Sequence, residues 1–195
     1  MVSGLYLVTR PKIIMHKLLQ LVLALVMSGG IAFYQWYNTP FYPLNGQAFT
    51  IDEMRKFYEA DKQQQRDLRN ARVARRVFAR YSCGQKELPI LVGRNIRNTP
   101  LSPAVVAATI VVESSCNPSA ISPAGAVGLL QVMPKVWGVP RKELLNPARN
   151  IEVGTRILSG YVKQSGLRDG LKRYYGMFDG SDAYADRILM IAGAR

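Results

Sequence analysis

The stretch SPAVVAATIVVESSCNP, residues 102–118, predicts a buried helix that carries one acid at its end. Ser102 followed by Pro103 is typical of a helix start, with a capping hydroxyl and then proline at the first helical position. Pro118 disfavours helix in the residue before it, so the helix is expected to end close to Asn117. Glu113 then lies in the last turn.

Glu113 continues an apolar stripe, because Val106 and Ile110 precede it by seven and three residues and share its face of the helix. A carboxyl group in apolar surroundings keeps its proton to higher pH. The negative end of the helix dipole raises its pKa further. This is what a general acid needs near neutral pH, although the spacing alone is also compatible with an exposed glutamate at a helix end.

Composition indicates a globular protein that works near anionic material. The 195 residues are 48% hydrophobic and 9% aromatic, and the net charge is +13. The excess charge is +3 over residues 1–50, +4 over 51–80 and +6 over 81–195, so it is spread along the chain. A membrane surface, an acidic cell-wall polymer and nucleic acid all attract such a protein.

Scarce residue types exclude several chemistries. The only histidine is His16, and there are two cysteines, so Ser-His or Cys-His nucleophiles, His-rich metal sites and Cys-based zinc cages are not expected. No glycine-rich phosphate loop is present. Proton transfer is left to carboxylates, tyrosines or lysines, and no cofactor is expected. Cys83 and Cys116 are either a disulfide formed in an oxidising periplasm or two buried free thiols.

Residues 1–37 are predicted to form a cytoplasmic tail and a membrane anchor. The segment Leu18–Tyr34 has only two polar interruptions and would span roughly 25 Å as a helix, a little less than a bilayer core of about 30 Å. Three basic residues precede it and none follows before Arg55, which predicts a cytoplasmic N-terminus and a periplasmic remainder at the inner membrane. The alternative is a signal peptide starting at Met15 and cleaved near residues 30–32, with secretion to the periplasm.

Residues 38–82 are predicted to be a linker followed by a charged amphipathic helix. Two prolines and an Asn-Gly pair mark the linker. Thr50 and Glu53 then form a capping-box pattern, and the helix is expected to end near Cys83. This helix is interpreted as a solvated stalk, with contact to membrane headgroups or a partner protein as the alternative.

Several short motifs occur in order along the rest of the chain. They are E-S at residues 113–114, N-P at 117–118, S-P-A-G-A-x-G-L-x-Q-V-M-P at 122–134, Trp137, N-P-x-x-N-I at 146–151, R-Y-Y-G at 173–176 and Y-x-D-R-I at 184–188. Together they resemble the lytic transglycosylases of the soluble-lytic-transglycosylase (SLT) type, in the lysozyme-like superfamily. The resemblance spans about residues 83–195, which are predicted to be the catalytic domain.

The resemblance implies that Glu113 is a single catalytic acid/base acting on peptidoglycan. It would protonate the glycosidic oxygen between N-acetylmuramic acid (MurNAc) and N-acetylglucosamine (GlcNAc), and then accept a proton as the muramyl 6-hydroxyl closes on C1 to give a 1,6-anhydro product. Ordinary glycosidases need two carboxylates. The sequence leaves open whether folding brings Glu143, Glu152 or an aspartate close to Glu113.

The resemblance also implies substrate-binding roles, each with a structural alternative. Ser114 would orient the carboxylate or the substrate, or make a helix-end hydrogen bond. Gly128 would let the glycan approach the backbone, and Gln131 would bond N-acetyl or hydroxyl groups. Met133 would pack on a sugar or in the core. Tyr174 would face the acid across a substrate cleft or belong to the core.

Two residues near these motifs need separate mention. Tyr175 departs from the family pattern, which usually has Asn at this position. Asn150 is predicted to cap a helix that begins at Ile151.

The expected fold is mainly α: a lysozyme-like (α+β superfamily) helical domain with a substrate cleft, preceded by an N-terminal transmembrane or signal helix and a charged helix. Further short helices are predicted at residues 134–138, 141–145 and 182–192. The alternatives for function are a lysozyme-type muramidase on the same fold and a non-catalytic, membrane-anchored module that binds glycan or a partner. Expected partners are peptidoglycan, the inner membrane and a candidate cell-envelope, secretion or phage complex, with no nucleic acid.

Overall fold

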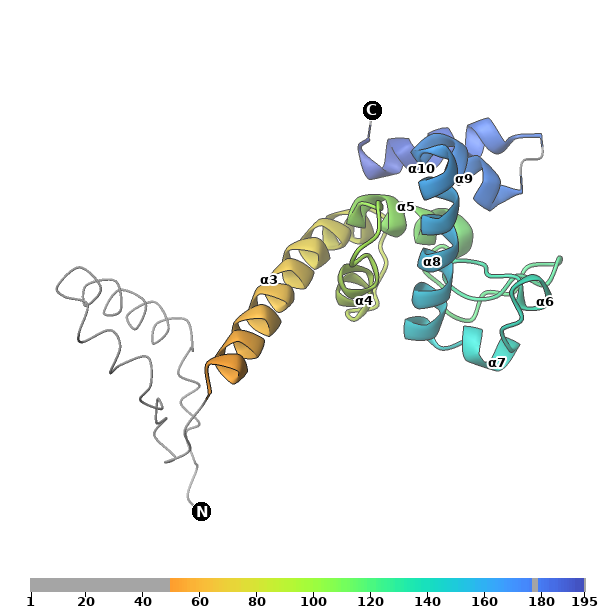
Figure 1. Ribbon diagram of the computed structural model, residues 1–195. Helices are drawn as coiled ribbons and strands as arrows, with labels where there is room; N and C mark the ends of the chain where they lie inside the picture. The colour runs from red at the N-terminus through yellow and green to blue at the C-terminus, as the bar shows by residue number, and fades with distance from the viewer. Residues whose placement is uncertain (1–49, 177–178, 195) are drawn as a thin grey trace, which may run out of the picture. The chain divides into compact units, whose positions relative to one another are not determined.

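The computed structural model describes residues 50–176 and 179–194 (Figure 1). The predicted anchor or signal segment and most of the predicted linker lie outside these residues. Within the described part of the chain, no helix is both long enough and apolar enough to cross a membrane.

Helices make up nearly all of the regular structure in the described residues, as the sequence predicts. They are α3 (Ile51–Arg80), α4 (Leu88–Asn95), α5 (Pro103–Ser114), α6 (Pro134–Trp137), α7 (Arg141–Leu144), α8 (Pro147–Ser165), α9 (Leu167–Tyr175) and α10 (Ser181–Ala192). The short helices α6, α7 and α10 lie within one residue of their predicted bounds. No strand occurs among the described residues, where Val127 forms isolated bridges with Ile121 and Val132.

The capping box at the start of α3 is present. The Thr50 backbone N–H donates to Glu53 Oε2 at 2.7 Å, and the Glu53 N–H donates to Thr50 Oγ1 at 3.3 Å. Two backbone donors that the first helical turn leaves free are thereby satisfied.

The C-terminal half of α3 packs into the helical core. The chain divides into two compact units, residues 1–59 and 60–195, and the predicted domain boundary at residue 83 falls inside the second. Buried side chains of α3 begin at Asp67 and continue through Ala74 to Phe78. The first helical turns of α3 have exposed side chains, and the later turns are part of the domain. The role of a solvated stalk stays a prediction.

Asp67 fixes α3 to the segment that follows α4. Arg97 Nε donates to Asp67 Oδ1 at 2.9 Å, its Nη2 contacts Oδ2, and Gln63 Nε2 donates to Oδ1 at 2.9 Å. Burial by itself would raise the pKa of Asp67, but the hydrogen bonds from Arg97 and Gln63 and the charge of Arg97 outweigh it, so the pKa is lowered. The carboxylate therefore stays ionised inside the protein.

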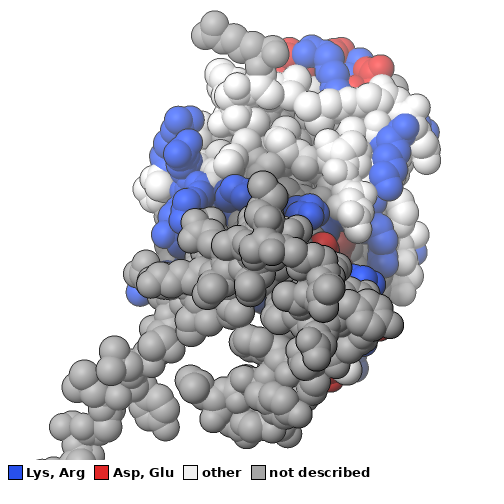
Figure 2. Space-filling model, turned by 60° about the vertical axis from the view of Figure 1, so that its left-hand side comes forward, with Lys and Arg blue, Asp and Glu red and all other residues white. Residues whose placement is uncertain are grey.

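Helix α5 lies at the centre of the domain and is buried on all sides from Val105 to Val111. It packs against α10 and α4, while α8 packs against α9 and α4 (Figure 1). The surface charge is dispersed: on the face drawn in Figure 2, lysine and arginine side chains stand in separate groups with uncharged areas between them. Along the sequence, too, the excess charge is graded and does not form one dense patch.

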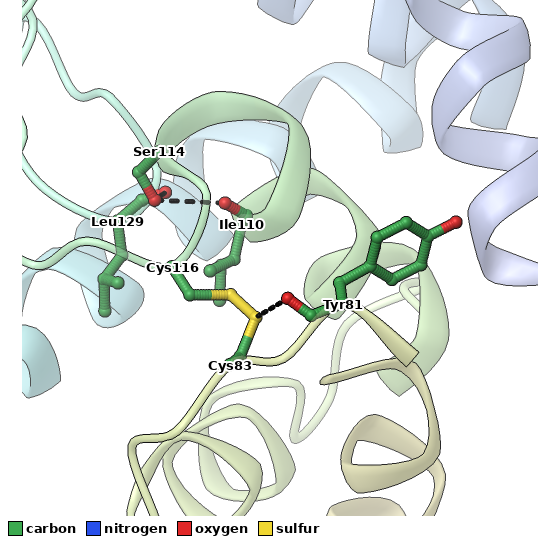
Figure 3. Close-up of a disulfide and its surroundings, with 6 residues drawn as sticks. All are labelled: Tyr81, Cys83, Ile110, Ser114, Cys116 and Leu129. Atoms are coloured by element: carbon green, nitrogen blue, oxygen red, sulfur yellow. Dashed lines mark hydrogen bonds between the residues drawn. A yellow bond between two sulfur atoms is a disulfide. The ribbon is translucent and has the colours of Figure 1, made fainter. Parts of the chain in front are cut away.

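A disulfide between Cys83 and Cys116 joins the loop after α3 to the loop after α5 (Figure 3). The two Cα atoms are 5.6 Å apart. The sequence left this pair open between a disulfide and free thiols, and the structure has the disulfide. Because Cys116 comes three residues after Glu113, the bond anchors the end of the helix that carries the candidate acid.

Candidate active site

Helix α5 begins and ends where the sequence predicts. The Ser102 hydroxyl accepts a hydrogen bond from the Val105 N–H at 3.2 Å, and Pro103 is the first helical residue. At the other end the backbone turns through two successive left-handed residues, Ser115 (φ 49°) and Cys116 (φ 65°). Neither is glycine, so this turn is costly and needs its surroundings to hold it. The disulfide at Cys116 supplies such a constraint.

Glu113 lies half-buried in the last turn of α5, and Tyr184 on α10 reaches its carboxylate. The Tyr184 hydroxyl donates to Glu113 Oε1 at 2.5 Å. Desolvation by burial raises the pKa of Glu113, and the hydrogen bond from Tyr184 offsets part of that rise. Burial and the negative charge of Glu113 also raise the pKa of Tyr184, so this hydroxyl keeps its proton and remains a donor.

The hydroxyl of Tyr174, which the resemblance predicts to face the acid, has a backbone hydrogen-bond partner, and its role in binding substrate stays a prediction. The Tyr174 hydroxyl donates to the backbone oxygen of Leu130 at 2.7 Å, so it holds the loop before α6. The tyrosine that bonds the acid is Tyr184. Tyr174 is nevertheless close enough for the charge of Glu113 to raise its pKa, after the larger effect of burial.

Tyr184 belongs to the Y-x-D-R-I motif, but the sequence does not assign it a role. A usable signal was its position four residues before Ile188, which places both on the buried face of α10. The ring of Tyr184 stacks on that of Tyr175, with centroids 4.8 Å apart. Tyr175, which departs from the family pattern, therefore supports the tyrosine that bonds the acid.

Ser114 ties α5 to the following loop. Its hydroxyl oxygen lies 3.0 Å from the Ile110 oxygen and 2.9 Å from the Leu129 oxygen, so its one proton can be donated to either carbonyl (Figure 3). This includes the helix-end hydrogen bond that the sequence offered as the structural alternative. No hydrogen bond joins Ser114 to the Glu113 carboxylate in the described part of the chain.

Gly128 has a packing role that the sequence did not reveal. Its φ is +77°, and a Cβ at this position would lie 2.3 Å from Asn150 Nδ2 and 2.6 Å from the Leu144 oxygen. Protein atoms, rather than an approaching glycan, therefore account for glycine here. Contact of Gly128 with substrate stays a prediction.

Gln131 and Met133 lie in the same loop. Gln131 has φ +45°, and its Nε2 donates to the Gly128 oxygen at 2.9 Å and the Ala120 oxygen at 3.3 Å. The amide nitrogen thus organises the loop itself. Met133 is half-buried at the start of α6, and the sugar contacts expected of both residues remain predictions.

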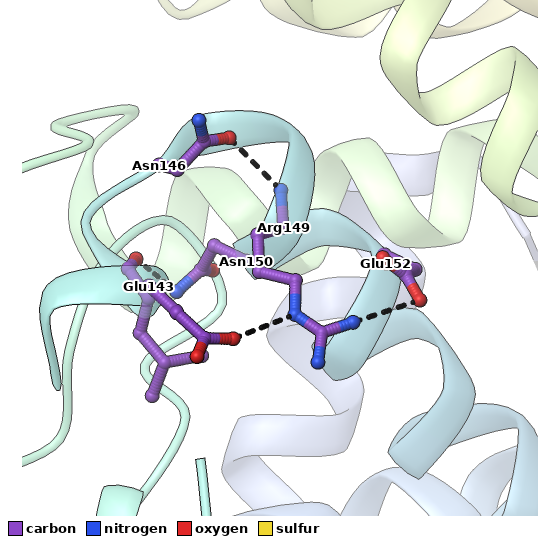
Figure 4. Close-up of polar contacts among 6 residues, drawn as sticks. Glu143, Asn146, Arg149, Asn150 and Glu152 are labelled. Atoms are coloured by element: carbon purple, nitrogen blue, oxygen red, sulfur yellow. Dashed lines mark hydrogen bonds and ion pairs between the residues drawn. The ribbon is translucent and has the colours of Figure 1, made fainter. Parts of the chain in front are cut away.

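Asn150 does not cap a helix, contrary to the sequence prediction. Helix α8 begins at Pro147, and Asn146 caps it by accepting from the Arg149 N–H at 3.1 Å (Figure 4). Asn150 is fully buried one turn later. Its Nδ2 donates to the oxygens of Val127 (2.8 Å) and Leu144 (2.9 Å), and its Oδ1 accepts from the Leu130 N–H (2.7 Å). This side chain holds the loop that Tyr174 also holds.

The carboxylates considered as partners for Glu113 are engaged elsewhere. Arg149 lies between Glu143 (3.3 Å) and Glu152 (3.0 Å) and pairs with both (Figure 4). Asp182 and Asp186 pair with Arg168. Across residues 50–176 and 179–194, the hydrogen bond from Tyr184 is the only one to the Glu113 carboxylate, and no second carboxylate contributes to its pKa.

The site thus consists of one half-buried acid at the end of a central helix, held by a tyrosine and followed by a loop that buried hydrogen bonds fix in place. Comparison with protein families matches residues 91–183 to the Transglycosylase SLT domain. This part of the chain belongs to the SLT-type lytic transglycosylases, the family that the sequence motifs resemble.

Similar proteins agree with this assignment. The membrane-bound lytic murein transglycosylase C of Actinobacillus pleuropneumoniae is 28% identical over 67% of this chain and 41% of the relative. The endo-type membrane-bound lytic murein transglycosylase A of Klebsiella pneumoniae is 37% identical over 37% of this chain and 40% of the relative. The chain therefore spans about two fifths of the curated relatives that it matches.

A solved structure has the same fold. A 70-kDa soluble lytic transglycosylase, in complex with bulgecin A, matches 60% of this chain and 24% of its own, with a TM-score of 0.50 and 21% identity. At this identity the match supports the lysozyme-like fold and does not by itself assign an activity.

Proposed function

We propose that this protein is a peptidoglycan lytic transglycosylase that cleaves the MurNAc–GlcNAc β-1,4 bond and forms 1,6-anhydro-MurNAc, with Glu113 as its single acid/base. The carrying observation is the state of Glu113: half-buried, with a raised pKa and with Tyr184 as its hydrogen-bond donor. The relatives described above are named lytic murein transglycosylases, which supports the same substrate.

The first step uses the carboxyl proton of Glu113, whose pKa is raised by burial. Glu113 donates it to the glycosidic oxygen as the bond from that oxygen to C1 of MurNAc breaks, and the GlcNAc end leaves as an alcohol. Tyr184 bonds Oε1 throughout, so it fixes the carboxyl group and stabilises the carboxylate that the step creates.

The second step returns the proton. The 6-hydroxyl of the same MurNAc attacks C1, a new bond forms from O6 to C1, and the hydroxyl proton passes to the Glu113 carboxylate. Because the nucleophile belongs to the sugar, neither a water-activating base nor a protein nucleophile is required. This accounts for a site in which Glu143 and Glu152 are held by Arg149.

Glu113→Gln tests this mechanism. The amide cannot transfer a proton, so we expect release of muropeptides from purified sacculi to fall by about 10²- to 10⁴-fold. Glu143→Gln is the matched control and should keep nearly full activity. Mass spectrometry identifies the reaction, because anhydro products are lighter than hydrolysed ones by one water. Full turnover by the Glu113 variant, or hydrolysed ends from the wild type, would contradict the proposal.

We also propose that the N-terminal segment holds the catalytic domain on the periplasmic side of the inner membrane. The disulfide suits an oxidising compartment, and the relatives are named membrane-bound. An uncleaved anchor predicts that the full-length chain stays with membranes after alkaline extraction. Recovery of a shortened chain in the soluble periplasmic fraction would favour the cleaved signal peptide instead.

A further inference from the structure

A surface cavity of about 430 Å³ lies between the end of α4 with the segment that follows it and one face of α8. Asn95, Arg97 and Thr99 line one side of it, and Arg156, Ser159 and Lys163 line the other. Its volume falls within the range of small-molecule sites in proteins. Neither Glu113 nor the tyrosines near it line this cavity.

One wall of the cavity is formed by residues that precede α5, whereas the candidate acid lies near the other end of that helix. Thr99 lies four residues before the first residue of α5, and Glu113 is its second-last residue. At 1.5 Å per residue, those ten helical steps from Pro103 to Glu113 separate the two ends by about 15 Å. The cavity is therefore a second site, distinct from the one that holds Glu113.

Three cations line this cavity, against one carboxylate. The buried Asp67 fixes the Nε and Nη2 atoms of Arg97, which leaves Nη1 without a partner among the described residues. Arg156 and Lys163 form no ion pair within the same part of the chain. The carboxylate is that of Glu152, which already pairs with Arg149. The charged groups of the cavity that are free to bind a ligand are therefore cations, which bind anions.

Spacing along α8 selects an elongated ligand. Arg156 and Lys163 are seven residues apart on one helix face, so their backbones lie about 10 Å apart. Ser159 and Gly160 form a low floor between them, and a Cβ added to Gly160 would meet no atom within 4 Å. Because the extended side chains of Arg156 and Lys163 can each bind a separate carboxylate, a short peptide with two carboxylates can engage both.

We propose that this cavity binds short acidic peptides through their carboxylates, and that the ligand is a stem peptide of peptidoglycan. The identity of the peptide rests on the proposed function, while the preference for a ligand with two carboxylates rests on the cavity alone. Binding there would hold the polymer by its peptides while the candidate acid acts on a glycan strand.

Direct titration tests the cavity. The probe is the tripeptide L-Ala-γ-D-Glu-diaminopimelate, titrated calorimetrically into the full-length protein in detergent. Arg156→Gln with Lys163→Gln should weaken binding by at least about 10-fold. Gly160→Leu should also remove binding, because the side chain occupies the open space, and it should leave the helix at least as stable. Lys142→Gln on α7 is the control and should bind as the wild type does.

Three outcomes of this titration would overturn the proposal. They are unchanged affinity in both cavity variants, equal affinity for the tripeptide with its carboxylates esterified, and equal competition by inorganic phosphate at the same concentration. The last would make the cavity a site for single anions. A thermal melt of each variant shows that a loss of binding is not a loss of folding.

Activity measurements separate failure of the cavity from failure of the proposed function. Wild type should cleave intact sacculi and also glycan strands stripped of peptides by an amidase. The cavity variants should show a raised KM on sacculi and unchanged cleavage of bare strands. Equal slowing on both substrates would overturn the cavity proposal. If wild type cleaves neither, the proposed function fails, and the titration still decides whether the cavity binds the tripeptide.

Discussion

At the scale of single residues, two tyrosines on neighbouring helices divide the support of the site. Tyr184 donates to the Glu113 carboxylate, and Tyr174 donates to the Leu130 backbone. A hydrogen bond to the ionised carboxylate lowers its pKa, in opposition to desolvation. The two hydroxyl groups should therefore have different effects when removed.

Tyr184→Phe should shift the pH–rate profile upward. Without the donor, the pKa of Glu113 rises further, so the fall in kcat/KM at high pH moves to higher pH. The maximal rate should drop by about 10- to 100-fold, because a hydrogen bond to a charged group contributes about 1.5–3 kcal/mol. A pH–rate profile on sacculi measures both effects.

Tyr174→Phe is the matched control for that experiment. It leaves the Leu130 carbonyl without its donor, which should cost about 1–3 kcal/mol of stability. It removes no hydrogen bond from Glu113, so the fall at high pH should stay in place. Identical pH profiles for the Tyr184 variant and wild type would contradict the positioning role of Tyr184.

Local signals place Glu113 at the end of a buried helix, whereas its selection as the candidate acid depended on the motif resemblance. An acid in an apolar stripe, between a capping serine and an Asn-Pro stop, is defined within 17 residues. The role of Tyr184 depends on how α10 packs against α5, 71 residues away in sequence. Since Tyr174 and Tyr184 both point inward, periodicity alone could not choose between them.

At the scale of elements, the ends of α5 and α8 show what capping signals can predict. Ser102-Pro103 and Asn146-Pro147 are the same signal, a capping side chain followed by proline, and both begin a helix. The prediction that Asn150 caps a helix was wrong, because the Asn146-Pro147 pair begins α8 four residues earlier. Its buried bonds to the loop arise from tertiary contacts and have no local signature.

The extent of the domain was harder to predict than its helices. Apolar positions of α3 that pack into the core are confined to its last third, among many arginines. The many charged residues therefore made it hard to recognise the amphipathic pattern that would have indicated packing of this helix into the domain. The resemblance spans about residues 83–195, so the predicted catalytic domain begins after this helix.

Removing the disulfide should destabilise the domain and slow its reaction. Cys83 and Cys116 are 33 residues apart, and closing a loop of that size contributes about 2–4 kcal/mol. Cys83→Ser with Cys116→Ser should therefore lower the free energy of unfolding by that amount in guanidinium titrations. The variant should also react more slowly than the wild type at temperatures where it is still folded, because Glu113 lies on the helix end that the disulfide no longer holds.

Reductant provides the control for the disulfide. Dithiothreitol should destabilise the wild type to the level of the double serine variant and leave the variant unchanged. If the variant unfolded at the same guanidinium concentration as the oxidised wild type, the disulfide would have no stabilising role.

At the scale of the whole molecule, two carboxyl groups that the fold removes from water have pKa shifts in opposite directions. The described residues contain no histidine, since His16 lies outside them. The pKa of Asp67 is lowered, so its contribution to stability is complete above the pKa of the unfolded chain and is lost on acidification. The pKa of Glu113 is raised, which gives it the opposite dependence on pH.

Glu113→Gln should therefore stabilise the protein at high pH more than at low pH. Below the unfolded-state pKa near 4.5, Glu113 is protonated in both states and burial carries no charge penalty. As the pH rises toward the higher folded-state pKa, Glu113 ionises first in the unfolded chain. Folding must then either bind a proton at Glu113 or desolvate its charge, and both cost free energy. The variant avoids this loss, and its melting temperature should exceed that of wild type by about 2–4 °C per kcal/mol recovered.

Thermal melts at pH 5 and pH 8 measure this difference, with Glu152→Gln as an exposed control. The gain from the Glu113 variant should be larger at pH 8, whereas the control should change little between the two conditions. A variant that is less stable than wild type at pH 8 would mean that Tyr184 and the surrounding protein stabilise the carboxylate more than burial destabilises it. Glu113 could not then hold its proton near neutral pH, so this melt tests the general acid without substrate.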